Sequence, residues 1–345
     1  MAYRAAVVGG SGYTGAELLR LLAGHPEIEV VHVTADSNAG AAVGALYPSL
    51  AAAYPALEYA SYAPADLAGV DVAFVALPHG ESQGIAPALV ERVAHVVDLG
   101  ADFRLPASVY ERWYGRPHTA PDLLDGFAFG LPELFAEAVG RGPHVAAPGC
   151  YPTAVALALG PLVAGALVEP TGLVVDAMSG VSGRGRGLST ASLYSEANEN
   201  VAAYTLLTHR HTGEMEWALG RAANTDVQLL FTPHLVPMTR GLLATCHARP
   251  SRGGLTTASL LETFRAFYAG ARFVSVLDDP PVTKATLGSN GAHVTVRFDD
   301  RTGSVLALCA LDNLGKGAAG QAIQCANLVL GLPEATGLPV VGIMP

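Results

Sequence analysis

The stretch Arg4-Ala5-Ala6-Val7-Val8-Gly9-Gly10-Ser11-Gly12-Tyr13-Thr14-Gly15 decides the fold of this chain. Its first half is apolar and typical of a short buried strand, and its second half is a glycine-rich turn. Three leucines then recur at helical spacing, which predicts a helix over residues 14–24, and a second strand is expected at 28–34. A strand, a glycine turn, a helix and a strand in this order are typical of a dinucleotide-binding unit.

The glycines of the turn follow a G-x-x-G-x-x-G spacing, a variant of the usual fingerprint. Glycines let backbone N–H groups approach a pyrophosphate, which the N-terminus of the helix then holds. Similar turns also occur without a ligand. The residues expected at the nucleotide are Gly9, Ser11, Gly12, Tyr13, Thr14 and Gly15.

The choice between NAD and NADP depends on the residues after the second strand, Asp36-Ser37-Asn38. Asp36 favours NAD, because a carboxylate binds the ribose 2′-OH and repels a 2′-phosphate. Ser37 and Asn38 could instead donate hydrogen bonds to such a phosphate. These residues leave both nucleotides open.

Three further strands are expected at 70–77, 93–99 and 144–147. The first two end in Pro78-His79-Gly80 and in a turn at 100–104, and the third delivers Cys150 to the same sheet edge. Because ligands bind at the carboxyl ends of strands in open α/β sheets, these turns should face the cofactor. Residues 1–149 are therefore expected to form a Rossmann-type doubly wound parallel sheet.

The pattern changes after Pro170. Longer strands are expected at 172–178, 228–235, 241–248, 293–298 and 304–311, with helices at 214–223 and 256–268. Residues 150–315 therefore read as an α+β substrate and oligomerisation domain. A last helix at 317–330, within a segment 316–345, is expected to pack back on the first domain.

Composition narrows the possible partners. The net charge of −10 argues against nucleic acid and anionic membranes, and the low charged fraction of 14% favours a homodimer or homotetramer. Four cysteines without a CxxC pair, and an N-terminus without a signal-peptide pattern, fit the cytoplasm. The uncharged run 146–168 is long enough to raise a membrane question, but its prolines favour a buried helix.

Ala147-Pro148-Gly149-Cys150-Tyr151-Pro152-Thr153 places a cysteine in a tight turn. Pro152 suits the first turn of a helix, so Cys150 would lie at the helix N-terminus, which favours a thiolate. The alternative is a buried structural cysteine. After a nucleotide-binding half, the turn suggests a hydride-transfer enzyme that works through a thioester, with Cys150 between the two domains.

Such an enzyme needs a general acid or base, and the candidates are His209 and His211, which flank Arg210. The alternative is a solvated helix start in which Arg210 pairs with Glu214 four residues later. No His, Cys, Asp or Glu spacing indicates a metal site, and no G-x-S-x-G elbow indicates a serine hydrolase.

Over nearly its whole length the chain resembles the N-acetyl-gamma-glutamyl-phosphate reductase family (type 1) of arginine biosynthesis, which is related to aspartate-semialdehyde dehydrogenase. Besides the glycine and cysteine turns, the matching segments are Ala76-Leu77-Pro78-His79-Gly80, Asp98-Leu99-Gly100-Ala101-Asp102-Phe103-Arg104, Ser179-Gly180-Val181-Ser182-Gly183, His209-Arg210-His211-Thr212, Ser289-Asn290 and Asp312-Asn313-Leu314-Gly315-Lys316-Gly317. Gly213 stands where the family commonly has proline.

The resemblance implies that NADPH reduces an acyl phosphate to an aldehyde and that phosphate is released. Cys150 would be the nucleophile that holds the thioester. His209 is the favoured proton-transfer partner and His211 the alternative. The expected cofactor is NADP, with further contacts from Ser37, Asn38, Pro78, Ser182, Gly183 and Asn313.

The implied small-molecule substrate carries a carboxylate and a phosphate, which arginines grip in a bidentate way. The arginine candidates are Arg104, Arg184, Arg186, Arg210 and Arg240, with Arg104 and Arg210 first. For each of them the alternative is a surface salt bridge that contributes little.

Three other functions stay open. One is the reduction of a carrier-protein-linked aminoadipyl phosphate in lysine synthesis, although an acidic carrier calls for a basic patch. Aspartate-semialdehyde dehydrogenase is the second. The third is an NADP-sensing regulatory protein, which would need neither Cys150 nor the His-Arg-His motif.

Overall fold

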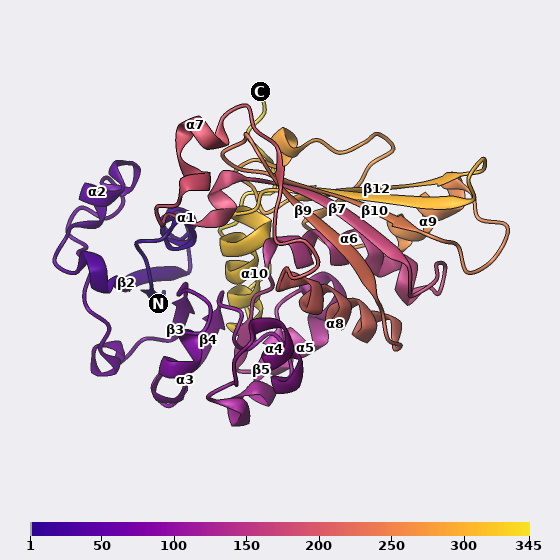
Figure 1. Cartoon of the computed structure of the whole chain (residues 1–345). Coiled ribbons are helices and arrows are strands. Elements are labelled where there is room, and N and C mark those ends of the chain that lie inside the picture. The colour runs from indigo at the N-terminus through magenta and orange to yellow at the C-terminus, as the bar shows by residue number, and fades with distance from the viewer. Residues whose placement is uncertain (1) are drawn as a thin grey trace. The chain divides into compact units, whose positions relative to one another are not determined.

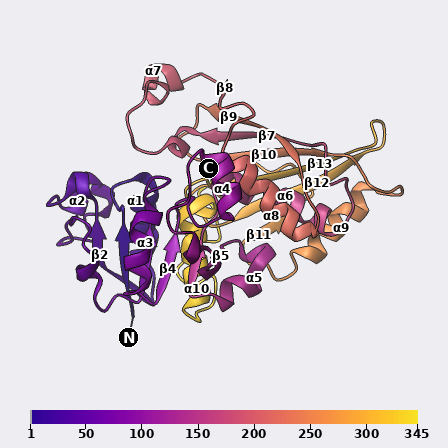
Figure 2. The same ribbon diagram turned by 60° about the horizontal axis from the view of Figure 1, so that its bottom comes forward.

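The apolar run at the start of the chain forms β1 (Tyr3–Val8), a strand inside a six-stranded parallel sheet. The computed structural model describes residues 2–345. The sheet order is β2-β1-β3-β4-β6-β5 (Figures 1 and 2). The other strands are β2 (Ile28–Thr34), β3 (Val72–Val75), β4 (His95–Asp98), β5 (Phe127–Phe129) and β6 (His144–Ala146).

This sheet reverses its strand order at β1, because β2 lies on one side of it and β3 on the other. The carboxyl ends of β1 and β3 therefore flank a topological switch point, where open α/β sheets bind their ligands. The doubly wound parallel sheet expected from the sequence is confirmed.

The helices of this part of the chain are α1 (Tyr13–Leu22), α2 (Val43–Leu46), α3 (Ser82–Val90), α4 (Ala107–Tyr114), α5 (Pro132–Arg141) and α10 (Gly320–Val329). α10 is almost entirely buried, and its polar side chains are bonded to neighbours. Gln321 donates to the Gly130 carbonyl, and Asn327 Oδ1 lies 3.0 Å from His25 Nε2. These contacts attach the C-terminal helix to the parallel-sheet part of the chain.

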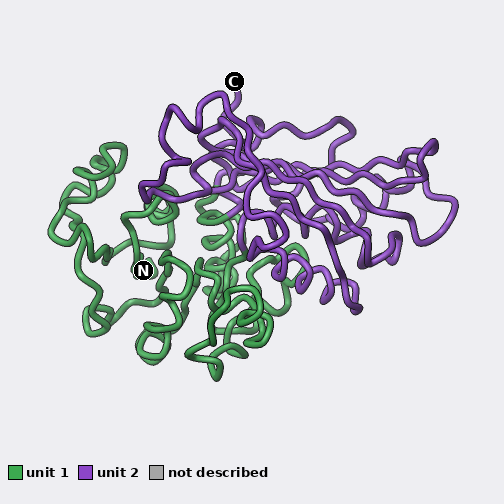
Figure 3. The backbone as a smooth tube through the Cα atoms, in the orientation of Figure 1, with its two compact units in different colours: residues 1–148, 318–338 green, residues 149–317, 339–345 purple. Residues whose placement is uncertain are grey.

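Two compact units divide the chain (Figure 3). Unit 1 contains the residues up to Pro148 together with Ala318–Leu338, and unit 2 contains Gly149–Gly317 and Pro339–Pro345. Cys150 is thus the second residue of unit 2. The last seven residues, which the sequence grouped with the C-terminal helix, belong to unit 2.

Unit 2 is built on a seven-stranded mixed sheet of order β11-β12-β13-β10-β7-β9-β8. The strands are β7 (Leu173–Gly180), β8 (Ala202–Ala203), β9 (Leu229–Val236), β10 (Leu242–Ala248), β11 (Val274–Val276), β12 (Ala292–Asp299) and β13 (Ser304–Leu311). The long strands match those predicted. The sequence missed β5, β8 and β11, which have three residues or fewer and so show no alternation.

The helices of unit 2 are α6 (Cys150–Ala164), α7 (Tyr194–Ala197), α8 (His211–Ala223) and α9 (Thr257–Phe267). α6 packs on β10 and β13 and against α8, on the lower side of the sheet in Figure 1. Every residue from Tyr151 to Val163 is buried, as expected of a helix that is apolar on all sides. Within the described residues, no helix has the length and apolar character needed to cross a membrane.

Candidate functional site

The glycine turn in unit 1 contains glycines of two kinds. Gly9 has φ +88°, and a Cβ there would stand 2.6 Å from the Ala76 carbonyl oxygen. A Cβ on Gly15 would stand 2.6 Å from the Cα of Gly10. Gly12 is different, because its nearest such neighbour is 3.9 Å away. Protein packing therefore explains Gly9 and Gly15 but leaves open space at Gly12.

Gly12 is also the N-cap of α1, and no side chain caps this helix. Its first turn carries no acidic residue, so its backbone N–H groups and positive dipole end suit an anion. Ser11 and Thr14 are half-buried, and Tyr13 is exposed. An open cradle of backbone donors at a helix N-terminus fits the pyrophosphate of a dinucleotide.

Asp36, Ser37 and Asn38 form a single helical turn after β2. The Asp36 carboxylate accepts a hydrogen bond of 2.9 Å from the backbone N–H of Tyr62, while the Asn38 amide donates to Ser37 Oγ at 3.0 Å. Asp36 therefore helps to hold the segment around Tyr62. The side chains of Ser37 and Asn38 lie next to one another on this turn.

The turns after β3 and β4 are linked by buried carboxyl groups. The Gly80 N–H donates to Asp102 Oδ1 at 2.7 Å, and Ser82 Oγ lies 2.9 Å from carboxyl oxygens of both Asp98 and Asp102. Pro78 is exposed on the first of these turns. The sequence located both turns but did not identify the three linking side chains.

Cys150 is the first residue of α6 in unit 2, and Gly149 is the N-cap. Cys150 is half-buried, whereas the other three cysteines are fully buried. The Gly149 N–H donates to the carboxylate of Glu214, which is 0% exposed, at 2.8 Å. Glu214 thus holds the turn from which Cys150 projects, and the predicted placement at a helix N-terminus is the one observed.

The two histidines predicted as acid or base lie together at the start of α8. Their ring centroids are 4.9 Å apart. The ring of Tyr151, the neighbour of Cys150, lies 5.6 Å from His209 and 6.0 Å from His211. Tyr204 packs against His209 at 5.6 Å and donates to the Tyr151 hydroxyl at 3.1 Å. One aromatic cluster therefore joins both histidines to the residue that follows the cysteine.

Burial sets the protonation of this cluster. It lowers the pKa of His209 to about 4, with a smaller effect from the Arg210 cation, so His209 is neutral at pH 7. His209 Nδ1 accepts the backbone N–H of His211 at 3.2 Å, so the ring proton of the neutral form is on Nε2. Burial also raises the pKa of Tyr204 to about 12, helped by the negative charge of Cys150, so this hydroxyl remains a hydrogen-bond donor.

Ser182, Gly183 and Asn313, expected at the cofactor, lie together in unit 2. Asn313 Nδ2 donates to Ser182 Oγ at 2.9 Å, and Asn313 Oδ1 accepts the Gly241 N–H at 2.8 Å. A Cβ on Gly183 would stand 2.9 Å from Ser179 Oγ. Asn313 thus fixes the turn that carries Ser182 and Gly183.

The two arginines named first for the substrate have different surroundings. Arg104 lies in unit 1, is 5% exposed and donates to the Leu99 carbonyl at 2.7 Å. Arg210 is exposed at the N-cap of α8. Among the other candidates, Arg240 pairs with buried Asp312 at 3.0 Å, and the Arg184 guanidinium lies 5.3 Å from the centroid of the Tyr204 ring.

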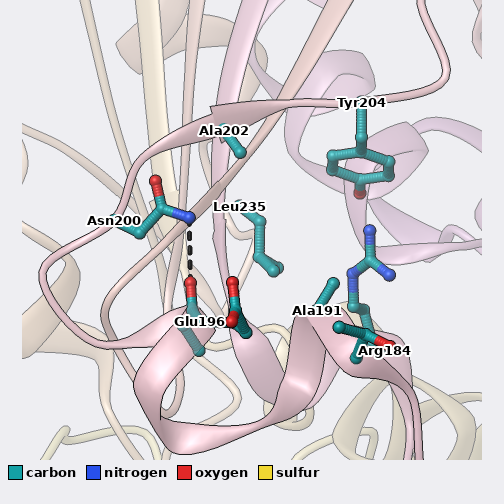
Figure 4. Close-up of a pocket in the computed structure, with 9 residues that line it drawn as sticks. Arg184, Ala191, Glu196, Asn200, Ala202, Tyr204 and Leu235 are labelled. Carbon is teal, nitrogen blue, oxygen red and sulfur yellow. Dashed lines mark hydrogen bonds between the residues drawn. The ribbon is translucent and has the colours of Figure 1, made fainter.

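A pocket of about 250 Å³ opens beside Tyr204 (Figure 4). The close-up shows the guanidinium of Arg184 next to the Tyr204 hydroxyl on one side of the pocket. On the other side, Asn200 donates a hydrogen bond to the Glu196 carbonyl. The lining residues are Arg184, Thr190, Ala191, Glu196, Ala197, Asn200, Ala202, Tyr204 and Leu235. The pocket therefore places a cation and polar groups next to the tyrosine that contacts His209.

The sequence missed Glu214 and Tyr204. Glu214 could have been noticed because it shares the helical face of the apolar residues Ala218 and Leu219 in α8, and a carboxylate on a buried helix face needs a partner. Tyr204 stands in an irregular segment with no periodicity. Within the described part of the chain, no three His, Cys, Asp or Glu side chains gather as metal ligands.

Comparison with known proteins matches both halves of the chain. Residues 4–141 match the family model described as "Semialdehyde dehydrogenase, NAD binding domain", and residues 150–313 match "Semialdehyde dehydrogenase, dimerisation domain". Curated relatives named N-acetyl-gamma-glutamyl-phosphate reductase come from Symbiobacterium thermophilum (48% identical, covering 98% of both chains) and Desulforudis audaxviator (47%, covering 98% of this chain and 99% of the relative).

Solved structures give the same fold at much lower identity. Aspartate semialdehyde dehydrogenase II of Vibrio cholerae superposes with a TM-score of 0.72 at 17% identity, covering 96% of this chain and 99% of the other. The Candida albicans aspartate semialdehyde dehydrogenase, solved with NADP, gives the same TM-score, identity and coverage. At this identity the likeness shows the two-domain fold alone.

Proposed function

Since the chain belongs to the N-acetyl-gamma-glutamyl-phosphate reductase family, we propose that it reduces N-acetyl-γ-glutamyl phosphate to the semialdehyde, with release of phosphate, in arginine biosynthesis. The observation that carries this proposal is the placement of Cys150 at the N-terminus of α6, beside the cluster of His209 and His211. It is the one cysteine that is not buried, and acyl transfer needs an accessible thiol.

Cys150 acts as the nucleophile. Its thiolate sulfur forms a bond to the acyl carbon, and the bond from that carbon to the phosphate oxygen breaks, which leaves a thioester and free phosphate. The positive end of α6 stabilises the sulfur anion before attack, and the Glu214 bond to Gly149 keeps the turn in place. A bound reduced dinucleotide would supply a hydride to the thioester carbon. The carbon–sulfur bond then breaks, which frees the aldehyde and returns Cys150 to its thiolate.

His209, the favoured proton-transfer partner, donates a hydrogen bond from its Nε2–H to the carbonyl oxygen as negative charge develops on that oxygen. Its neutral ring carries the proton on Nε2, the atom not used by the backbone, so it can donate without first being charged. His211 is the alternative partner. His209→Asn is expected to lower kcat by about 10²- to 10⁴-fold, and His211→Asn by less than tenfold. A larger loss of kcat in His211→Asn than in His209→Asn would assign the role to His211 instead.

We propose NADP as the cofactor, held in unit 1 by the glycine turn and Pro78. The fit of Gly12 supports a dinucleotide, and the engagement of Asp36 with Tyr62 supports NADP over NAD. Ser37 and Asn38 then supply neutral donors to the 2′-phosphate. Ser182, Gly183 and Asn313 are proposed as the cofactor contacts of unit 2. NADP is expected to give a KM at least tenfold below that of NAD.

For the substrate we propose Arg210 and Arg104 as the groups that bind its carboxylate and phosphate. Arg210 is exposed one residue from both histidines, which suits a substrate contact. Arg104 acts from a buried position in the turn after β4. Arg184, in the pocket beside Tyr204, is the next candidate. An arginine that binds only substrate should raise KM when replaced by lysine, because bidentate geometry is lost.

We further propose that the protein works in the cytoplasm as a homodimer or homotetramer. The reactive thiol requires reducing conditions. The face of the unit 2 sheet opposite α6 exposes apolar side chains, including Met178 at 43%. A second copy of the chain would cover this face.

The reverse reaction tests the activity. Purified protein should reduce NADP when given N-acetylglutamate semialdehyde and phosphate. Turnover with aspartate semialdehyde instead, or only with a carrier-bound aminoadipate semialdehyde, would contradict the proposal. Cys150→Ser should abolish turnover while nucleotide binding survives, and buried Cys246→Ser serves as the matched control.

A further inference from the structure

Unit 1 contains two buried carboxyl groups that share one hydroxyl. Asp98 ends β4 and is 1% exposed, and Asp102 follows in the next turn at 0%. Ser82 Oγ lies 2.9 Å from Asp98 Oδ2 and 2.9 Å from Asp102 Oδ2. A Cβ on Gly100 would stand 2.9 Å from Asp98 and 3.0 Å from Ser82 Oγ, so only glycine fits beside this group.

Proton counting decides the charge of the group. A serine hydroxyl has one hydrogen and can donate to only one of the two carboxyl groups. If both were ionised, one of the two short contacts would hold two oxygens with no proton between them, in a site shielded from water. One carboxyl must therefore carry a proton and donate it to Ser82 Oγ.

Asp102 is the ionised member. It accepts four hydrogen bonds, from the Gly80 N–H (2.7 Å), the Gln83 N–H (3.1 Å), the Tyr110 hydroxyl (3.1 Å) and the Ser82 hydroxyl. The Gln83 N–H belongs to the first turn of α3, whose dipole also favours an anion.

Asp98 is the protonated member. It donates its proton to Ser82 Oγ and accepts the Gly100 N–H at 2.8 Å. Burial raises its pKa to about 7, and the Asp102 charge adds to the rise, while the Gly100 and Ser82 hydrogen bonds and the Arg104 cation oppose it.

The same group holds the turn after β3. Gly80 has φ +93° and is bonded to Asp102, and the His79 carbonyl accepts Arg116 at 2.5 Å. This turn carries Pro78 and lies at the carboxyl end of β3, beside the switch point of the sheet. We therefore expect the position of this turn to depend on whether one or both of Asp98 and Asp102 are ionised.

We propose that Asp98, Ser82 and Asp102 are positioning residues for nucleotide binding, and that they hold the turn after β3 in place by keeping one proton on Asp98. Loss of that proton puts a second anion under the turn and breaks the bond to Ser82. The anionic nucleotide then binds more weakly. This inference rests on the proposed function, because it takes unit 1 to bind a dinucleotide.

Other charged and titratable groups lie around Asp98, and the test must separate their effects from that of Asp98. Asp102 and the Arg104 guanidinium act on it directly. Tyr110 faces Asp102 from α4, and His118 Nε2 lies 2.8 Å from the Asp102 carbonyl oxygen. Only Asp98 among them both loses a proton near neutral pH and bonds to Ser82, so its replacement is the decisive variant.

The test is the dissociation constant of NADP, measured by calorimetry between pH 6 and 9 on the full-length protein. In the wild type, Kd should rise by about three- to tenfold as Asp98 loses its proton, the cost of roughly one net hydrogen bond. Asp98→Asn should bind with a Kd that stays near the wild-type value at pH 6. Its amide can donate to Ser82 and accept from Gly100, as the protonated acid does.

The matched control is Asp71→Asn, which removes a carboxylate next to the opposite end of β3, where it accepts the Arg4 N–H. This variant should keep the wild-type pH dependence. Any titration of the nucleotide itself affects the wild type and the variants equally, so it cancels when their Kd values are compared. Equal pH dependence in wild type and Asp98→Asn would overturn the proposal.

An infrared spectrum gives a readout that needs no nucleotide. A protonated carboxyl band should be present at pH 6 in the wild type, absent in Asp98→Asn, and lost as the pH rises past neutrality. Its absence from the wild type at pH 6 would overturn the proposal. A protein that shows the band but binds no nucleotide at any pH would contradict the proposed function instead.

Discussion

At the scale of one residue, Glu214 shows how the fold holds the turn that carries Cys150. Its carboxylate lies 65 residues from Gly149 in sequence, yet it accepts the N–H of that residue directly before Cys150. Because the side chain is fully buried, the bond is shielded from water and couples the start of α8 to the start of α6. A carboxylate is costly to bury without a partner, so its bond to the Gly149 N–H indicates a positioning role for Glu214.

We predict that Glu214→Gln keeps this bond and Glu214→Ala loses it. The glutamine carbonyl can accept the Gly149 N–H, whereas alanine leaves that donor buried without its partner. Glu214→Ala should lower the free energy of unfolding by about 1–3 kcal/mol, measured by urea denaturation. Its kcat should fall more than that of Glu214→Gln. Equal losses in both variants would show that the charge, not the bond, is what matters.

At this scale the sequence predicts the position of a residue correctly when neighbouring residues alone determine it. The Pro-Gly-Cys-x-Pro turn encodes a helix start, so the position of Cys150 could be predicted without tertiary information. Glu214 could not be assigned in this way, because its partner is distant in sequence. The same limit applies to Asp98, whose chemistry depends on a hydroxyl 16 residues earlier.

At the scale of elements, close packing leaves no room for side chains at two positions of the segment that leads into α10. Residues Gly315–Ala319 form a π-helical turn before it. A Cβ on Gly315 would stand 2.2 Å from the Ser289 carbonyl oxygen, and one on Gly317 would stand 2.8 Å from Cys150 Cβ. The sequence predicted one regular helix from 317, because a glycine-rich helix start carries no sign of a wider turn.

We predict that Gly317→Ala displaces the cysteine turn. The added methyl group has no room beside Cys150, and overpacking of this kind costs about 1–3 kcal/mol. Turnover should fall, while the affinity for nucleotide changes little. Gly140→Ala in α5, where a Cβ meets nothing within 4 Å, is the matched control and should be neutral. Wild-type kcat in Gly317→Ala would mean that the turn adjusts at no cost.

At the scale of the whole molecule, the open face of the unit 2 sheet predicts self-association. Leu243 lies on this face, paired with Met178 on β7 and Ala310 on β13. Leu243→Asp should convert the proposed oligomer to monomers, measured by light scattering after gel filtration, because a buried unpaired charge is costly at an interface. Val282→Asp, at an exposed loop position, should leave the mass unchanged. A wild-type protein that is already monomeric would refute the prediction.

The fold as a whole followed from the sequence because its long elements are strongly patterned. The parallel sheet was predictable from short apolar runs that end in glycine turns, and the mixed sheet from longer alternating runs. The pocket beside Tyr204 was not, because its lining comes from the irregular segment 184–204 and from β9. Such a segment takes its conformation from tertiary contacts that no local pattern encodes.

Buried histidines also predict how the whole molecule responds to acid. Burial lowers the pKa of His144 in unit 1 and of His209 in unit 2 to about 4, and lowers that of His25. The unfolded chain therefore binds more protons than the native one between pH 6.5 and about 4, so stability is lost as the pH falls through that window. Asp98 acts in the opposite direction, because its raised pKa stabilises the native state as the pH falls below about 7.

Asp98 belongs to unit 1, where it offsets much of the effect of His144 and His25, so acidification should destabilise chiefly unit 2, through His209. A net loss of about 2 kcal/mol between pH 7 and 4.5, discounted for partial exposure of the rings, would lower Tm by about 4–8 °C in domains of this size. Thermal unfolding followed by circular dichroism at both pH values measures it. His144→Asn should reduce the acid sensitivity of unit 1 only, and Asp98→Asn should increase it. An unchanged Tm at pH 4.5 would mean that the rings stay protonated in the native state.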